Sequence, residues 1–364
     1  MVKFLTNLGL YLHIPFCKRK CAYCDFYSAV FTDELVDRYV DSLKDSIKKW
    51  GGKISRPINS IYLGGGTPSL LNHRLIPLLN TVKENFTLES NTEITLELNP
   101  QNDILSVLEN AKKAGVNRLS IGVQSGNDTL LKKLGRTHSA QDAENAVKLA
   151  KQLGFSNISL DLMIGLPDSD LNTLKSDLDF LLKLNPQHIS CYILKIEQNT
   201  AFYKQQSSLN LPDDDQISDQ YLFMCNYLKQ NGFSHYEISN FCKEGFESVH
   251  NLKYWNCEEY LGLGPSAHSY LNGKRFYYPA NLKDFINKNE PVFDCLGGET
   301  EEKIMLALRL DSGINIDALP KKAKEKCLSF SKNGLATLNG NRFSLTDEGM
   351  LVSNSIISEI LEDF

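Results

Sequence analysis

Short apolar runs alternate with longer amphipathic stretches over the first half of the chain. The apolar runs fall at residues 8–14, 58–63, 93–98, 118–123, 158–163 and 188–194. Between them, apolar residues recur at steps of three and four over residues 33–50, 73–85, 104–114, 140–153 and 171–184. The runs predict buried strands, whereas the three- and four-residue steps predict amphipathic helices.

The regular order of these elements predicts the fold class. Strand and helix alternate six times, which is typical of parallel β/α units joined by right-handed crossovers. Glycines at positions 51, 52, 115 and 154 stand where helix ends are expected. We therefore expect an α/β protein. An open parallel sheet and an incomplete barrel both fit the pattern.

The pattern changes after Leu194. A polar stretch ends in Pro212 and three aspartates, which predicts a helix start before residues 216–231. The last segment has the pattern of helix, helix, hairpin and helix, with Asn339-Gly340 as the hairpin turn. Three regions follow from this organisation. They are residues 1–200 with the six β/α units, residues 201–298 as a connecting region, and residues 299–364 as a smaller α+β, winged-helix-like domain.

Composition and charge narrow the class of protein. Of the 364 residues, 42% are hydrophobic and 23% are charged, which is ordinary for a globular protein. A net charge of −5, with eight Lys/Arg against eleven Asp/Glu in residues 299–364, disfavours a nucleic-acid partner. No window of 18 residues is uninterruptedly apolar, and the N-terminal run is too short for a signal peptide. We expect a soluble, cytoplasmic protein without a transmembrane segment.

Three of the nine cysteines lie close together, directly after the first apolar run. Cys17, Cys21 and Cys24 have the spacing C-x3-C-x2-C, and three thiolates on so short a loop can converge on one metal centre. A four-iron cluster would then keep one iron free for a small molecule with an amine and a carboxylate. The alternatives are a disulfide, which suits secreted chains, a zinc site with His13 as fourth ligand, and buried structural thiols. Because the three cysteines are clustered while the other six are dispersed, we favour the iron–sulfur site.

Polar residues stand where the predicted strands end. They are Gly64, Gly65, Gly66, Thr67, Glu97, Gln124, Arg136 and Asp161. The glycines fit a simple turn as well as a backbone that approaches a ligand closely. Singly, each polar residue could be an ordinary surface residue. Together they offer a cation, two carboxylates and an amide at one rim, which suits a ligand with a carboxylate, an amine and ribose hydroxyls.

The motif Tyr11-Leu-His-Ile-Pro-Phe-Cys17, with the spacing of the three cysteines, resembles radical S-adenosylmethionine (radical SAM) proteins of the HemN/HemW branch. The resemblance covers most of the chain. It implies an incomplete (β/α)6 barrel whose ligands lie at the carboxyl ends of the strands. It also implies that Cys17, Cys21 and Cys24 ligate a [4Fe–4S] cluster.

The same resemblance implies a set of residues that hold SAM. They are Tyr11, Gly65, Gly66, Thr67, Glu97, Gln124, Arg136 and Asp161. Tyr11 matches the aromatic residue beside the sulfonium group, and the glycines with Thr67 match the segment along the methionine part. Charge assigns Arg136 to the SAM carboxylate and Glu97 to its amine.

A second motif, His250-Asn251-Leu-Lys-Tyr254-Trp255, also matches this branch. An imidazole can ligate haem iron, and neighbouring aromatic rings can pack on the macrocycle. If the stretch is helical, His250 and Tyr254 lie one turn apart on the same face. A single histidine is more often structural, and His268 is a second candidate. The motif match favours His250 as a haem ligand, with Tyr254 and Trp255 beside the ring.

Two relatives within the branch have different functions. The oxygen-independent coproporphyrinogen III dehydrogenase has a fourth cysteine two places after the third and a long N-terminal extension. Here Phe26 occupies that position, and only about ten residues precede the first strand. The resemblance therefore favours a haem chaperone that hands haem to acceptor proteins such as respiratory-chain components. The alternatives are the dehydrogenase or another radical SAM enzyme, and an acidic winged-helix regulator. A homodimer and a peripheral position at the membrane during haem delivery are further expectations.

Overall fold

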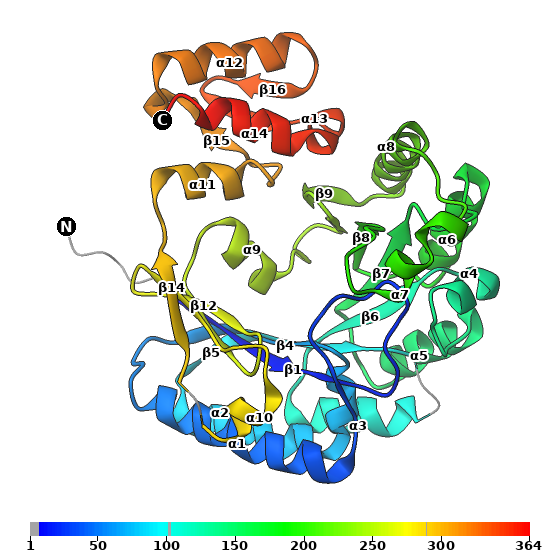
Figure 1. Ribbon diagram of the computed structural model, residues 1–364, viewed down its shortest axis with the longest axis vertical. Coiled ribbons are helices and arrows are strands. Elements are labelled where there is room, and N and C mark those ends of the chain that lie inside the picture. Colours follow the sequence, from blue (N-terminus) through cyan, green and yellow to red (C-terminus); the bar gives the residue numbers. More distant parts are fainter. Residues whose placement is uncertain (1–6, 101–102, 289) are drawn as a thin grey trace.

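Six parallel strands run in chain order through the centre of the molecule (Figure 1). They are β1 (Leu8–Ile14), β4 (Ile58–Gly65), β5 (Leu88–Leu98), β6 (Arg118–Gln124), β7 (Ile158–Ile164) and β8 (His188–Ile193). Each pairs in parallel with the next. The computed structural model describes residues 7–100, 103–288 and 290–364, so residues 1–6, 101–102 and 289 of the predicted regions lie outside the described residues. The α/β class and the incomplete (β/α)6 barrel are confirmed.

The predicted helices cover the outer face of this sheet (Figure 1). They are α1 (Asp33–Gly51), α2 (Leu75–Asn85), α3 (Ile104–Ala114), α5 (Ala140–Gln152) and α6 (Leu171–Lys183). Helix α2 begins two residues later than predicted, because residues Pro68–Arg74 form a 3-10 helix. A short helix, α4 (Asp128–Lys133), was not predicted from the sequence; the Asn127 side chain caps it by accepting from Thr129 N and Leu130 N.

The barrel strands place apolar side chains outward and polar ones inward. Leu10, Leu12 and Ile61 are fully buried against the helices. The buried polar side chains of the same strands include Ser60, Thr95, Arg118, Ser159 and His188. Two of them bond to each other inside the barrel, where a hydrogen bond of 2.7 Å joins Ser159 Oγ to His188 Nδ1. The barrel therefore encloses a polar interior rather than a uniform apolar core.

Residues 201–298 extend the sheet at both of its ends. At one end β11 (Tyr260–Leu263) pairs in parallel with β1 and is followed by β12 (His268–Leu271), β13 (Lys274–Tyr277) and β14 (Val292–Leu296). At the other end β10 (Asn240–Cys242) pairs with β8, and β9 (Ser234–Glu237) follows. The helices of this part are α7 (Ala201–Lys204), α8 (Asp214–Gln230), α9 (Val249–Trp255) and α10 (Leu282–Ile286). The predicted boundaries at residues 200 and 298 stay predictions.

The last segment forms its own small layer at the top of Figure 1. It contains α11 (Thr300–Ala307), β15 (Ile314–Asn315), α12 (Lys321–Lys332), β16 (Ala336–Asn339), β17 (Arg342–Leu345), α13 (Asp347–Leu351) and α14 (Ser353–Leu361). The predicted hairpin is present, since β16 and β17 pair with Asn339 opposite Arg342, and Gly340 takes a φ of 62° in the turn. Strand β15 completes a three-stranded sheet in the order β15-β17-β16.

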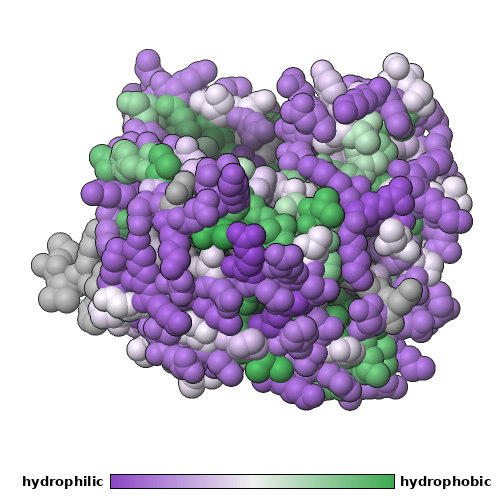
Figure 2. Space-filling view, turned by 60° about the horizontal axis from the view of Figure 1, so that its bottom comes forward, coloured by the Kyte–Doolittle hydropathy of each residue, from purple (hydrophilic) through white to green (hydrophobic). Residues whose placement is uncertain are grey.

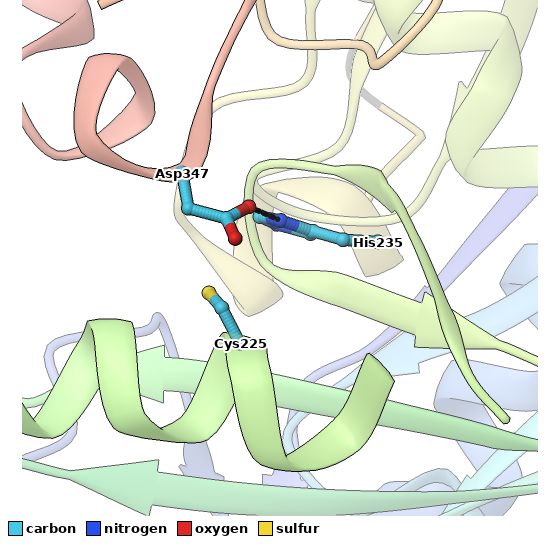
Figure 3. Close-up of side chains that lie close together, drawn as sticks. All are labelled: Cys225, His235 and Asp347. Carbon is cyan, nitrogen blue, oxygen red and sulfur yellow. Dashed lines mark hydrogen bonds and ion pairs between the residues drawn. The ribbon is translucent and has the colours of Figure 1, made fainter. Parts of the chain in front are cut away.

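A partly buried polar contact joins this C-terminal layer to the rest of the chain (Figure 3). His235 Nδ1 on β9 lies 2.9 Å from Asp347 Oδ1 on α13, and Lys229 Nζ on α8 lies 2.6 Å from Asp347 Oδ2. Cys225 on α8 completes a group whose ligand-type atoms lie within 4.8 Å of one another. Because Lys229 already neutralises Asp347, this group is best described as an ion-paired contact between the two parts.

Most of the face turned forward in Figure 2 is hydrophilic, with a smaller group of hydrophobic residues near its centre. None of the helices in the described part of the chain combines the length and the apolar character needed to cross a bilayer.

Candidate functional site

A cavity of about 560 Å³ lies at the carboxyl ends of the barrel strands. The three clustered cysteines line it together with the polar strand ends. These lining residues include Cys17, Cys21, Cys24, Gly65, Gly66, Thr67, Glu97, Gln124, Arg136 and Asp161. Tyr11 is not among the lining residues; it lies behind the wall, where a Cβ added to Gly64 would come within 3.1 Å of its ring. The structure thus brings together predicted residues from four strands or the residues directly after them (β4, β5, β6 and β7), from the cysteine loop and from the loop after α4.

The cysteine loop folds back onto the barrel through a two-residue strand pair. Strand β2 (Phe16–Cys17) pairs in parallel with β3 (Ala29–Val30), so the loop is held at both of its ends. The three thiols are free and partly exposed. Burial raises the pKa of Cys17 and Cys24, so in the absence of a metal these groups remain protonated.

The donor set and the space beside it fit an iron–sulfur cluster. Three sulfurs face one cavity, and thiolates are the ligands that such clusters require. A Cβ on Gly66 would lie 2.7 Å from Phe16 O and 3.1 Å from Cys17 Sγ. Only glycine therefore allows the strand end to approach the cysteine loop this closely.

Two hydrogen bonds hold the Arg136 guanidinium in place and leave its third nitrogen without a partner among the described residues. Its Nη1 donates to Asn99 Oδ1 at 2.7 Å, and its Nη2 donates to Tyr23 OH at 2.8 Å. Its buried Nε has no hydrogen-bond partner among the described residues. A fixed cation with an unused donor beside a cavity fits an anionic ligand group such as a carboxylate.

Two carboxyl groups face the same cavity. Glu97 accepts a hydrogen bond from Tyr62 OH at 2.8 Å and another from Gly65 N at 3.1 Å. Asp161 accepts one from Ser120 Oγ at 3.0 Å. Burial raises the pKa of Glu97 to about 7 and that of Asp161 to about 6. A ligand amine at this place would supply the positive charge that favours their ionised forms.

Sequence reasoning did not assign Asn99 and Tyr23 to the site. Asn99 follows β5 directly, and besides accepting from Arg136 it donates to Thr67 Oγ1 at 3.2 Å. Tyr23 lies inside the cysteine loop, with its hydroxyl on Arg136. The strand-end rule that picked out Glu97 applies equally to Asn99. Nothing local marks Tyr23 as a partner of an arginine 113 positions away.

The second motif lies away from the cavity, at the amino ends of the barrel strands. His250, Tyr254 and Trp255 belong to α9, so the conditional prediction that His250 and Tyr254 share a helix face is confirmed. His250 is 1% exposed, and its two ring nitrogens lie 2.9 Å from Ser60 Oγ and 2.9 Å from Tyr254 OH. Burial lowers its pKa to about 3, so the ring is neutral. In this conformation neither nitrogen is free to ligate iron.

Trp255 and His268, two further candidates for haem binding, are more accessible than His250. Trp255 is partly exposed, and the guanidinium of Arg309 lies 5.9 Å from its ring. His268, the second candidate ligand, is exposed on β12 and stacks on Tyr277 at 5.3 Å between ring centres. Haem ligation by His250 stays a prediction and requires its imidazole to leave Ser60 or Tyr254.

Comparison with known proteins agrees with this geometry. Residues 11–181 match the radical SAM superfamily model, and residues 299–352 match the HemN C-terminal domain model. The chain is 35% identical to "Heme chaperone HemW" of Lactococcus lactis subsp. lactis (strain IL1403), over 97% of each chain. It is 35% identical to the protein of the same name from Bacillus subtilis (strain 168), over 96% of this chain and 98% of that one.

A solved structure shares the fold at lower sequence identity. Coproporphyrinogen III oxidase (HemN) from Escherichia coli, described as a radical SAM enzyme, superimposes with a TM-score of 0.83 and 22% identity. The match covers 98% of this chain and 90% of that one. At this identity the likeness shows the fold alone.

Proposed function

The chain belongs to the HemW family of radical SAM proteins, and from that premise we propose that it is a haem chaperone, which binds haem and transfers it to acceptor haem proteins such as respiratory-chain components. The observation that carries the proposal is the match to proteins named heme chaperone over 97% of both chains. A second supporting observation is that Phe26 stands where a fourth cysteine would be expected in a coproporphyrinogen III dehydrogenase.

The cavity supports the cofactor half of the proposal. Cys17, Cys21 and Cys24 would hold a [4Fe–4S] cluster, which supplies one iron that a ligand amine and carboxylate can chelate. Arg136 would bind the carboxylate of SAM and Glu97 its amine, since both line this cavity. Thr67 and Gln124 line the same space and offer further polar contacts.

Replacing Arg136 by alanine should weaken SAM binding by on the order of 1.5–3 kcal/mol, because a charge-assisted and partly buried pair is lost. Equilibrium dialysis of the reconstituted protein with labelled SAM measures the change. Arg342→Ala, which removes an exposed side chain of strand β17, is the control and should leave the affinity unchanged. Equal affinity in wild type, Arg136→Ala and Glu97→Ala would place SAM elsewhere.

The function itself is tested by two assays on the same preparation. Haem-loaded protein should pass haem to an apo-form of a haem protein, followed by the absorption spectrum of the acceptor. Incubation with SAM, a reductant and coproporphyrinogen III should give no decarboxylated product. Product above background would favour the alternative, an oxygen-independent coproporphyrinogen III dehydrogenase or another radical SAM enzyme acting on a porphyrin.

Replacing His250 by alanine should change the absorption spectrum of bound haem, because the predicted axial ligand is lost. The expected stoichiometry is one haem per chain, with Tyr254 and Trp255 near the ring. The cluster spectrum should stay as it is, which distinguishes ligand loss from misfolding. His268→Ala is the matched variant, since His268 is exposed and reaches solvent without any helix movement. If only His268→Ala alters the spectrum, His268 is the ligand.

Assembly and location are further parts of the proposal. Strand β14 is an outermost strand of the large sheet, and it exposes Val292, Phe293 and Leu296. An unpaired strand edge with exposed apolar side chains can pair with a second chain, which supports a homodimer. A cytoplasmic location, with peripheral contact to the membrane during haem delivery, completes the proposal.

A further inference from the structure

Helix α9 is fixed tightly at the amino ends of the barrel strands. Its first two backbone N–H groups, those of Val249 and His250, each donate to the Glu93 carboxylate at 3.2 Å. At the other end Lys253, 2% exposed, donates to Asn7 O at 2.9 Å and to Glu258 at 3.0 Å. A seven-residue helix anchored in this way belongs to the barrel and has little independent freedom.

The imidazole of His250 is oriented by hydrogen bonds on both sides. Ser60 Oγ, on β4, lies 2.9 Å from Nδ1, and Tyr254 OH lies 2.9 Å from Nε2. A neutral imidazole has one donor and one acceptor, so these two hydroxyls use its whole capacity. The ring plane is therefore set by the protein and cannot rotate without losing a buried hydrogen bond.

This fixed ring packs against two tyrosines of the barrel. Its centre lies 5.3 Å from the Tyr62 ring and 6.3 Å from the Tyr11 ring, and the two tyrosines stack on each other at 6.2 Å. Such ring pairs prefer defined offsets, so moving one ring moves its neighbours. Gly9 leaves room for these side chains, because a Cβ there would lie 3.2 Å from His250 Cε1 and 2.8 Å from Lys253 Cδ and would displace them.

Tyr62 connects the tyrosine pair to the wall of the cavity. Tyr62 OH donates to Glu97 Oε1 at 2.8 Å, while Gly65 N holds the other carboxylate oxygen at 3.1 Å. Glu97 lines the cavity, and Tyr62 and His250 stand behind it. Two consecutive contacts, His250 to Tyr62 and Tyr62 to Glu97, thus connect α9 to a carboxylate that lines the cavity.

We propose that His250 is a positioning residue of the SAM pocket: it holds the rings of Tyr62 and Tyr11 and thereby fixes the Glu97 carboxylate against the amine of SAM. The inference rests on the SAM half of the proposed function and is independent of haem. It gives the second motif a role in the conformation described here, in which the imidazole has no nitrogen free for iron. The same side chain can serve haem only after leaving Ser60 and Tyr254.

The test measures SAM affinity in full-length, reconstituted protein. His250→Ala should raise the dissociation constant of SAM about tenfold, because the Glu97 carboxylate would no longer be well oriented toward the amine. Tyr62→Phe keeps the ring but removes the bond to Glu97, so it should reproduce part of the loss. The reduced cluster should retain its iron content in both variants. The change that SAM causes in its electron paramagnetic resonance spectrum should be altered in His250→Ala.

His188→Ala is the matched control. His188 is also fully buried at this end of the barrel, and its ring nitrogens are bonded to Ser159 at 2.7 Å and to Tyr236 at 2.9 Å. Its removal should loosen the fold comparably without changing SAM affinity. Equal SAM affinity in His250→Ala and wild type would overturn the inference, and so would an equal loss in both histidine variants. Failure of wild-type protein to bind SAM would instead contradict the proposed function itself, and the inference with it.

Discussion

Anaerobic reconstitution of Cys17→Ala, Cys21→Ala or Cys24→Ala with iron and sulfide should give protein without a [4Fe–4S] centre. The reason is that each of the three thiols lines the cavity and a three-ligand cluster has no spare ligand. Four of the other cysteines (Cys191, Cys225, Cys242 and Cys327) are buried in other parts of the fold. Iron and acid-labile sulfide analysis, together with the broad visible absorption of the cluster, measures the loss.

The control for this prediction is the same substitution at a cysteine that is more buried and lies outside the cysteine loop. Cys327→Ala, in α12 of the C-terminal layer, should retain the wild-type iron content. It shows whether removing any thiol damages assembly indirectly. A variant lacking all three loop cysteines that still carries four irons per chain would disprove the assignment.

The barrel could be predicted because its strands have a simple signature. Short runs rich in apolar residues, such as residues 158–163, are typical of strands, and helices separate them at regular intervals. What the runs could not reveal is the character of the inner face. Ser159 and His188 stand in predicted strands, yet their side chains are buried and bond to each other inside the barrel.

The candidate site could be predicted as far as it follows local rules. The cysteine spacing and the strand ends needed only neighbours in sequence, and the structure brings Cys17, Glu97 and Arg136 to one cavity. The surroundings of His250 could not be predicted in this way. Its partners Ser60 and Glu93 lie 190 and 157 positions away, and a hydroxyl or a carboxylate carries no signal of so distant a contact.

The role of residues 201–298 shows the same limit. Strand β11 has four residues, Tyr260–Leu263, and it pairs with β1 across most of the chain. Short strands of this kind are identified by their partner rather than by their own pattern, because pairing and burial determine most of their stability. The sequence therefore predicted a connecting region where the structure has additional strands of the main sheet.

The largest effect on stability is expected from Glu93, which is buried at the base of the barrel. Its carboxylate lies 3.9 Å from Arg118 Nε, and it accepts from the backbone N–H groups of Val249 and His250. Arg118 is 1% exposed and Glu93 is 7% exposed. Glu93→Ala leaves a buried cation without this carboxylate and two backbone donors without this acceptor. Breaking a buried pair in this way destabilises a fold by about 3–5 kcal/mol.

Urea unfolding of Glu93→Ala, followed by circular dichroism, should therefore show a much lower midpoint than wild type. Glu109→Ala, on the exposed face of α3, is the control and should change the free energy of unfolding by less than about 0.5 kcal/mol. Adding Arg118→Met to Glu93→Ala should restore part of the loss, because it removes the uncompensated charge. If Glu93→Ala alone unfolds like wild type, Arg118 does not depend on this carboxylate and α9 is held by its remaining contacts.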